Sequence, residues 1–241
     1  MKKVYFISDV HLGFGSREQN SKRETLFLAF LDEIKQDCSD LYIVGDLFDF
    51  WFEYKRVVPK GYFLILAKLH ELKKSNIKIH YIIGNHDCLI KDYFEKEIGI
   101  KIYWEGIEPK IFDKKFFIHH GDGLSSNDTG YKILKKFLRN KVNQYLFSLI
   151  HPDLGIWMGT YFSKKSRSYT SKKDYGKTDA LYLFAKNKIQ AGFDFVILGH
   201  IHKLAMTNID SGTYINLGDW IKYYSYGSFD GTNFSLKQIT L

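Results

Sequence analysis

The stretch Lys3-Val4-Tyr5-Phe6-Ile7-Ser8-Asp9-Val10-His11 decides how the chain folds. Its apolar run, Val4–Ile7, has the length of a short buried strand and gives way to polar side chains at Asp9. The same pattern recurs at Leu41–Val44, which ends at Gly45-Asp46, and at Ile77–Ile83, which ends at Gly84-Asn85. The sequence therefore predicts buried strands that carry polar residues at their carboxyl ends.

Helical spacing separates these runs. Ser21–Lys35 places large apolar residues on one face, and Gly61–Lys74 is predicted to be a helix after Pro59. Alternating strands and helices predict a parallel sheet with helices on its faces, and such sheets bind ligands beyond the carboxyl ends of their strands. Further strands are expected at Lys101–Tyr103, Pro109–Phe112, Phe116–His119 and Phe195–Leu198, with antiparallel strands in residues 205–241.

The 80 positions from His120 to His200 are too many for a simple loop, and a helical segment is expected from about Thr129 to Gly192. We therefore expect an α/β protein: a β-sandwich flanked by helices, with a helical lid insertion. The core would comprise residues 1–124 and 193–241, and the lid residues 125–192.

Composition supports a folded protein, because 45% of the 241 residues are hydrophobic and 17% are aromatic. Cys38 and Cys88 give no disulfide framework and fit a reducing compartment. Val4–Ile7 is too short for an export signal, and no stretch approaches the roughly 18 apolar residues that span a bilayer. We expect a cytoplasmic protein, and attachment to a membrane surface is compatible with the sequence.

The net charge of +8 is unevenly distributed along the chain. Residues 125–192 contain 13 Lys/Arg and 4 Asp/Glu, a net of +9, whereas the remainder has 22 and 23, a net of −1. Within 131–150, Leu134, Leu138, Val142, Tyr145, Leu146 and Leu149 form an apolar stripe beside basic residues. A basic amphipathic helix indicates contact with anionic lipid; packing on its own domain is the alternative.

Polar clusters follow five of the predicted strands. They are Asp9-Val10-His11, Gly45-Asp46, Gly84-Asn85-His86-Asp87, His120-Gly121-Asp122 and Gly199-His200-Ile201-His202. Mn²⁺, Fe²⁺ and Zn²⁺ accept such mixed sets of carboxylate, amide and imidazole ligands. A single cluster of this kind is weak evidence for function, but five in this order predict a metal site. Burying so many polar groups without a metal would leave them without bonding partners.

This set of motifs resembles the calcineurin-like metallophosphoesterase superfamily over nearly the whole chain. The resemblance implies an enzyme with two divalent metal ions, Mn²⁺ first, with Fe²⁺ or Zn²⁺ as alternatives. One metal would be held by Asp9, His11, Asp46 and His202, and the second by Asp46, Asn85, His120 and His200. Asp46 would bridge the two metals.

The chemistry expected of such a centre is attack by a metal-activated hydroxide in line with the phosphorus–oxygen bond. His86 would bind phosphate or act as a general acid beside the leaving group, with Asp87 orienting its ring. A purely structural role is the alternative for His86. His119 should point to the opposite face of its strand from His120.

Within the superfamily, the layout resembles the UDP-2,3-diacylglucosamine pyrophosphatases of lipid A biosynthesis. The likeness rests on residues 45–51 (GDLFDFW), on residues 120–131 and on the length of the lid. It implies hydrolysis of the pyrophosphate at the α-phosphorus, giving UMP and 2,3-diacylglucosamine 1-phosphate (lipid X). The substrate contacts that it implies are Asn85, His86, Asp128, Trp51, Lys172 and Lys173. Many proteobacterial members have Gly-Asn-Arg where this chain has Gly84-Asn85-His86.

The resemblance therefore implies two partners: a UDP-linked acylated sugar, and the cytoplasmic face of the inner membrane, to which the protein would attach peripherally. Neither nucleic acid nor an obligate protein partner is expected. Other metal-dependent phosphodiesterases remain alternatives. A nuclease would use the basic segment to bind a phosphate backbone in a salt-sensitive manner. A nucleotide pyrophosphatase would not need an apolar lid, and a non-catalytic scaffold would bind metal without hydrolysing a phosphodiester.

Overall fold

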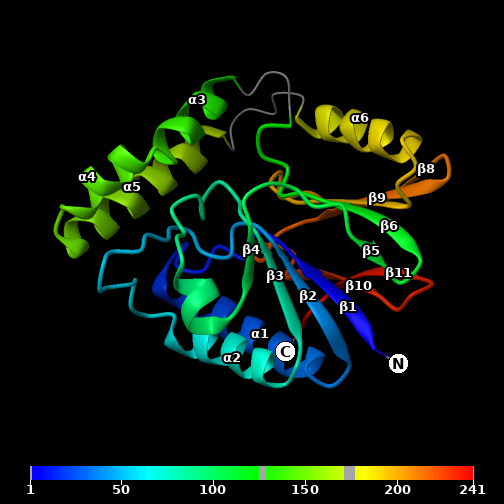
Figure 1. Cartoon of the computed structure of the whole chain (residues 1–241), viewed down its shortest axis with the longest axis horizontal. Helices are drawn as coiled ribbons and strands as arrows, with labels where there is room; N and C mark the ends of the chain where they lie inside the picture. Colours follow the sequence, from blue (N-terminus) through cyan, green and yellow to red (C-terminus); the bar gives the residue numbers. More distant parts are fainter. Residues whose placement is uncertain (1, 125–128, 171–176, 241) are drawn as a thin grey trace.

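Two β-sheets pack face to face in the computed structural model, which describes residues 2–124, 129–170 and 177–240 (Figure 1). The first sheet contains β1 (Lys3–Ile7), β2 (Cys38–Val44), β3 (Lys78–Ile82), β4 (Lys101–Tyr103), β10 (Ser225–Phe229) and β11 (Phe234–Gln238), in the order β11-β10-β1-β2-β3-β4. The second contains β5 (Lys110–Ile111), β6 (Lys114–Ile118), β7 (Phe195–Leu198), β8 (Leu204–Ile209) and β9 (Gly212–Leu217), in the order β5-β6-β7-β9-β8.

Parallel pairing brings the carboxyl ends of the central strands to one edge. β1 to β4 are parallel in the first sheet, and β6, β7 and β9 are parallel in the second. The expected antiparallel pairs of the tail are confirmed for β8 with β9 and for β10 with β11. The structure adds two pairings that the alternation did not predict, β9 parallel to β7 and β10 antiparallel to β1.

Strand β1 explains why its sequence is apolar at nearly every position. Val4 and Phe6 face the second sheet, in a cluster that includes Phe116 and Phe229. Its other side chains, such as Ile7, lie in the cluster beneath the outer helices. Successive residues of a strand point to opposite faces, so a strand covered on both faces is a continuous apolar run.

Helices cover the outer face of each sheet. The apolar faces of α1 (Arg17–Ile34) and α2 (Phe63–Lys74) pack on the first sheet, as expected from their spacing. α1 begins earlier than predicted because Ser16 caps it, its side chain accepting from the N–H of Gln19. A short π-helix, Phe94–Ile98, precedes β4. On the second sheet lies α6 (Lys177–Gln190), which buries Leu181, Ala185 and Ile189.

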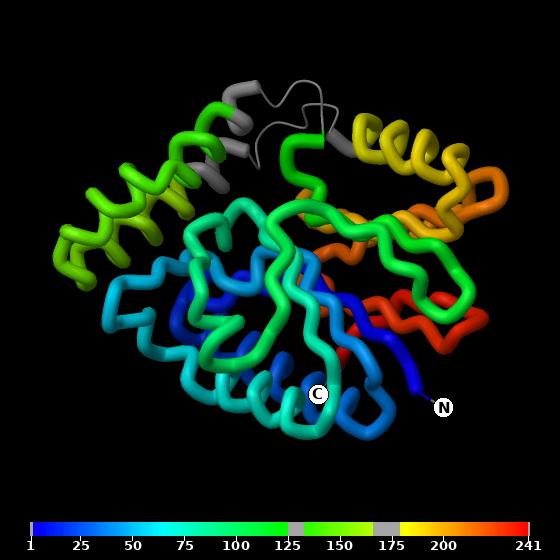
Figure 2. The backbone as a smooth tube through the Cα atoms, viewed as in Figure 1, coloured from blue at the N-terminus to red at the C-terminus, as the bar shows by residue number. Residues whose placement is uncertain are grey.

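The insertion forms a separate group of helices, α3 (Thr129–Leu138), α4 (Lys141–Ser148) and α5 (Pro152–Thr170), to one side of the sheets (Figure 2). The single amphipathic helix expected within 131–150 is divided, because Asn140 has an extended backbone and caps α4 by accepting from the N–H groups of Val142 and Asn143. The expected lid boundary at residue 192 lies too late, since α6 packs on the core. Within the described ranges, no helix is both long and apolar enough to span a bilayer.

Candidate active site

The predicted metal ligands meet at the carboxyl edge of the two sheets. Asp9, Asp46 and Asn85 follow β1, β2 and β3 of the first sheet, and His120 and His200 follow β6 and β7 of the second. His11 and His202 lie two residues beyond Asp9 and His200. The facing sheets therefore each supply part of one polar site.

Left-handed backbone conformations aim many of these side chains inward. The φ angles are 53° at Asp9, 50° at His11, 54° at Asp46, 72° at His200 and 54° at His202. Such angles are rare outside glycine, cost on the order of 1–3 kcal/mol each and cluster at functional sites. Hydrogen bonds between the loops maintain them, including those from the N–H of Asp9 to the carbonyl of Gly45 (3.1 Å) and from the N–H of His11 to the carbonyl of Asp46 (3.0 Å).

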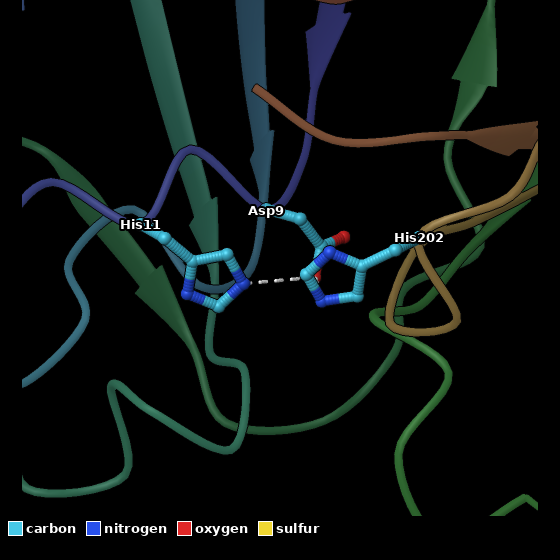
Figure 3. A group of neighbouring side chains, drawn as sticks. All are labelled: Asp9, His11 and His202. Carbon is cyan, nitrogen blue, oxygen red and sulfur yellow. Dashed lines mark ion pairs between the residues drawn. The ribbon is translucent and has the colours of Figure 1, made fainter. Parts of the chain in front are cut away.

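Asp9, His11 and His202 form the first group of potential metal ligands (Figure 3). Asp9 Oδ1 lies 3.5 Å from Nε2 of His11 and 3.5 Å from Nε2 of His202. It is buried and accepts no hydrogen bond from the part of the chain that the structure describes. Metal–ligand bonds of about 2.0–2.2 Å place neighbouring ligand atoms roughly 3–3.5 Å apart, so this geometry fits a shared cation.

Asp46 lies between this group and a second one. Its Oδ2 is 3.8 Å from His11 Nε2 and 3.3 Å from His120 Nε2. The Nε2 atom of His120 also lies 3.1 Å from Oδ1 of Asn85, and the His120 and His200 rings are 5.1 Å apart. One carboxylate oxygen near ligands of both groups is the arrangement required of a bridging ligand, so the residues fit two divalent cations.

The charges at this site also favour the binding of metal cations. Burial works to raise the pKa of Asp46, but His120, His86 and His11 outweigh it and hold that pKa well below its ordinary value. Burial would lower the pKa of His120, yet Asp46 and Asp9 raise it well above its ordinary value. A negative potential that attracts protons to a buried imidazole would also attract a metal ion.

Two ligand histidines are oriented by groups outside the metal site. The Nδ1–H of His120 donates to the carbonyl of Val44 (2.9 Å), and His202 Nδ1 lies 3.1 Å from Oδ2 of Asp219. Both contacts leave Nε2 facing the site, as is common for metal-binding histidines. Asp219 was not predicted as a functional residue. Its signal was Gly218-Asp219 directly after β9, the same pattern as Gly45-Asp46 after β2.

His86 lies beside this centre, but its ring is held differently from the prediction. Its Nε2 is 4.0 Å from Asp46 Oδ2, while Nδ1 lies 2.8 Å from the carbonyl oxygen of Asp49 and 3.1 Å from Ser163 Oγ. The predicted role for Asp87, orienting this ring, is wrong: the Asp87 carboxylate accepts from the backbone N–H of Asp46. Burial, reinforced by Asp46, raises the pKa of Asp87 to about 7.

Of the remaining predicted substrate contacts, the structure describes Trp51 but not Asp128, Lys172 or Lys173. Trp51 does not line the site, because its side chain is fully buried against Phe48 and Phe94 and its Nε1–H donates to Glu53 (3.1 Å). His119 is turned away from the ligand set as expected, accepting from the N–H of Gly121 through Nδ1 (2.8 Å).

A profile of the calcineurin-like phosphoesterase family matches residues 2–204. The chain belongs to this family. Two curated relatives are named UDP-2,3-diacylglucosamine hydrolase: that of Porphyromonas gingivalis is 34% identical and covers 98% of this chain and 97% of its own length, and that of Haemophilus influenzae is 30% identical and covers 93% of each.

The fold of this calcineurin-like phosphoesterase also matches a solved structure described as a novel archaeal phosphodiesterase, with a TM-score of 0.50 and 16% identity, over 98% of this chain and 99% of the other. The family uses divalent metals, which agrees with the ligand groups described above. Family membership and relatives of nearly equal length support a metal-dependent hydrolase.

Proposed function

We propose that this chain hydrolyses the pyrophosphate bond of UDP-2,3-diacylglucosamine to UMP and 2,3-diacylglucosamine 1-phosphate in lipid A biosynthesis. The observation that carries the proposal is the combination of a largely buried ligand set for two cations with an exposed apolar insertion, in a chain that matches relatives of that name over nearly their whole length. A small nucleotide substrate would require the ligand set but not the insertion.

The chemistry is divided among the residues at the edge of the sheets. When bound, two divalent ions would supply an activated water and positive charge for the phosphoryl oxygens, with Mn²⁺ as the proposed metal. Asp46 would hold both cations. His86 would direct Nε2 at the phosphate or leaving group, because its Nδ1 is engaged by Asp49 and Ser163.

The acyl chains of the substrate would lie on the insertion. Large apolar side chains are more than half exposed there, among them Ile133, Phe137, Val142, Tyr145, Leu149 and Trp157. Exposed apolar patches of this kind mark binding surfaces. We propose that α3–α5 act as a lid that takes the acyl chains, and that Lys172, Lys173 and Asp128 contact the diphosphate and sugar.

The insertion also suits a membrane surface, where this substrate would be found. Residues 125–176, without α6, contain 10 Lys/Arg and 3 Asp/Glu, and their net charge of +7 would attract anionic headgroups, while the exposed aromatic side chains would enter the interface. We propose a peripheral location on the cytoplasmic face of the inner membrane. No nucleic acid and no obligate protein partner are part of this proposal.

The test is an assay of the purified chain with Mn²⁺ that follows UMP release from UDP-2,3-diacylglucosamine. UDP-N-acetylglucosamine, which lacks the acyl chains, and a single-stranded oligonucleotide are the comparison substrates. The proposal expects UMP from the acylated substrate at least about 100-fold faster than from either comparison, because apolar burial supplies the difference. Preferred cleavage of the nucleotide sugar or of the oligonucleotide would refute it.

A further inference from the structure

We propose that Ser163, on helix α5 of the insertion, is a positioning residue for His86, and that Gly155 and Gly159 set the distance at which it acts. The inference deepens the proposed function, on which it rests. It assigns to the insertion a part in the cleavage step in addition to binding the acyl chains.

The contacts of the His86 ring define the role of Ser163. A carbonyl oxygen can only accept, so His86 Nδ1, 2.8 Å from the carbonyl of Asp49, must carry the proton. Ser163 Oγ, 3.1 Å from the same nitrogen, then accepts a share of that hydrogen bond. Together the two acceptors fix the tautomer and the tilt of the ring, so that Nε2 faces the site next to Asp46.

Ser163 can reach His86 only because α5 approaches the core closely. Gly155, Gly159 and Ser163 are spaced four residues apart and therefore share one face of the helix. A Cβ atom at Gly155 would clash with Oη of Tyr54, and one at Gly159 would clash with the Phe50 ring. A larger residue at either glycine would therefore force α5, or the Tyr54 or Phe50 side chain against it, to shift.

An aromatic contact fixes the insertion to the same segment. Phe147 of α4 packs on Phe52 at a centroid distance of 4.7 Å and on Phe50 at 6.5 Å. This segment directly follows Asp49, the other acceptor of the His86 ring. Both groups that hold the ring therefore depend on how the insertion sits against residues 49–54, so that its position affects the orientation of His86.

The first test is Ser163→Ala, assayed with UDP-2,3-diacylglucosamine and with bis(4-nitrophenyl) phosphate. We expect kcat to fall about 5- to 20-fold on both substrates, because the ring loses one of its two acceptors. KM should stay within about twofold and metal content should be unchanged. Ser148→Ala is the matched control, since Ser148 Oγ donates to the carbonyl of Tyr145 within α4. An unchanged kcat, or an increase in KM alone, would overturn the inference.

The second test is Gly159→Ala, alone and combined with Ser163→Ala. If Gly159 acts through the position of Ser163, the two losses will not add, and the double variant will be no slower than the slower single one. Additive losses would overturn the link between the glycine and the serine. If the wild type cleaves bis(4-nitrophenyl) phosphate but not the acylated substrate, the proposed function fails, while the Ser163 effect can still be measured on the first substrate.

Discussion

The polar edge of the sheets and the helical insertion differ in which side chains they bury and which they expose. At the edge, Asp9, His11 and His120 are completely buried, and hydrogen bonds between loops hold strained backbone in place. In the insertion, large apolar side chains such as Leu149 and Trp157 are at least 60% exposed. Chemistry requires groups that are positioned in advance, whereas recognition of a lipid needs apolar surface that the lipid itself can cover.

Changing the bridging carboxylate should produce the largest effect and should affect every substrate alike. Asp46→Asn removes the charge shared by both ligand groups while keeping the size of the side chain. We expect activity to fall at least about 10³-fold on acylated and simple phosphodiesters, because both cations lose the negative charge of their shared ligand. Parallel metal analysis should find less than two ions per chain. A variant that keeps two metals and full activity would contradict the assignment of this edge as the catalytic centre.

Asp219→Asn should have a smaller effect, a loss of affinity for only one of the two metal ions. The change removes the charge that orients His202, and groups that orient metal ligands typically contribute about 10- to 100-fold in metal affinity. Competition with a chelator should therefore show one weakened ion and one normal ion. Asp230→Asn is a suitable control. Asp230 accepts hydrogen bonds from the N–H groups of Thr232 and Asn233, as Asp219 does from those of Ile221 and Lys222. Unlike Asp219, Asp230 does not contact a ligand histidine in the described part of the chain. Equal weakening of both ions in the Asp219 variant would refute this prediction.

Substitutions in the insertion should have the smallest and most selective effect. Val142→Ser and Leu149→Ser each remove an exposed apolar side chain, so thermal stability should change by less than about 0.5 kcal/mol. The KM for the acylated substrate should rise about tenfold, since burying such a side chain contributes about 1.5–3 kcal/mol. Turnover of bis(4-nitrophenyl) phosphate should not change. Met206→Ser, on β8 of the core, is the control; if it raises the KM equally, the insertion has no special role.

The sequence predicted the parts of the molecule that follow from local pattern. The strand that ends at Asp9 and the strand that ends at Asp46 are visible because a buried run stops abruptly at a polar residue. Asp219 was missed although Gly218-Asp219 follows a strand, because residues 205–241 were expected to form antiparallel strands; β9 is instead parallel to β7 and therefore ends at the site. Likewise, the helix break at Asn140 depends on a cap that competes with a continuous apolar stripe.

The wrong predictions for Asp87 and Trp51 share a physical cause. Asp87 is adjacent to His86 in sequence, yet the two acceptors of the His86 ring are the carbonyl of Asp49 and Oγ of Ser163, 37 and 77 positions away. Trp51 follows the ligand Asp46 closely, but its indole is buried in the core rather than exposed to the site. Proximity along the chain fixes neither the direction of a side chain nor its partner, because tertiary packing decides both.

The most direct test of the central claim compares two substrates before and after removal of residues 133–165, which make up most of α3, α4 and α5, with a short glycine-serine linker in their place. The account predicts that the shortened chain still binds two metals and hydrolyses bis(4-nitrophenyl) phosphate, at a rate reduced about as much as by Ser163→Ala. It should release UMP from UDP-2,3-diacylglucosamine at least about 100-fold more slowly than the full chain. Undiminished hydrolysis of the acylated substrate by the metal-loaded, shortened chain would contradict the division between a catalytic edge and a substrate-selecting insertion.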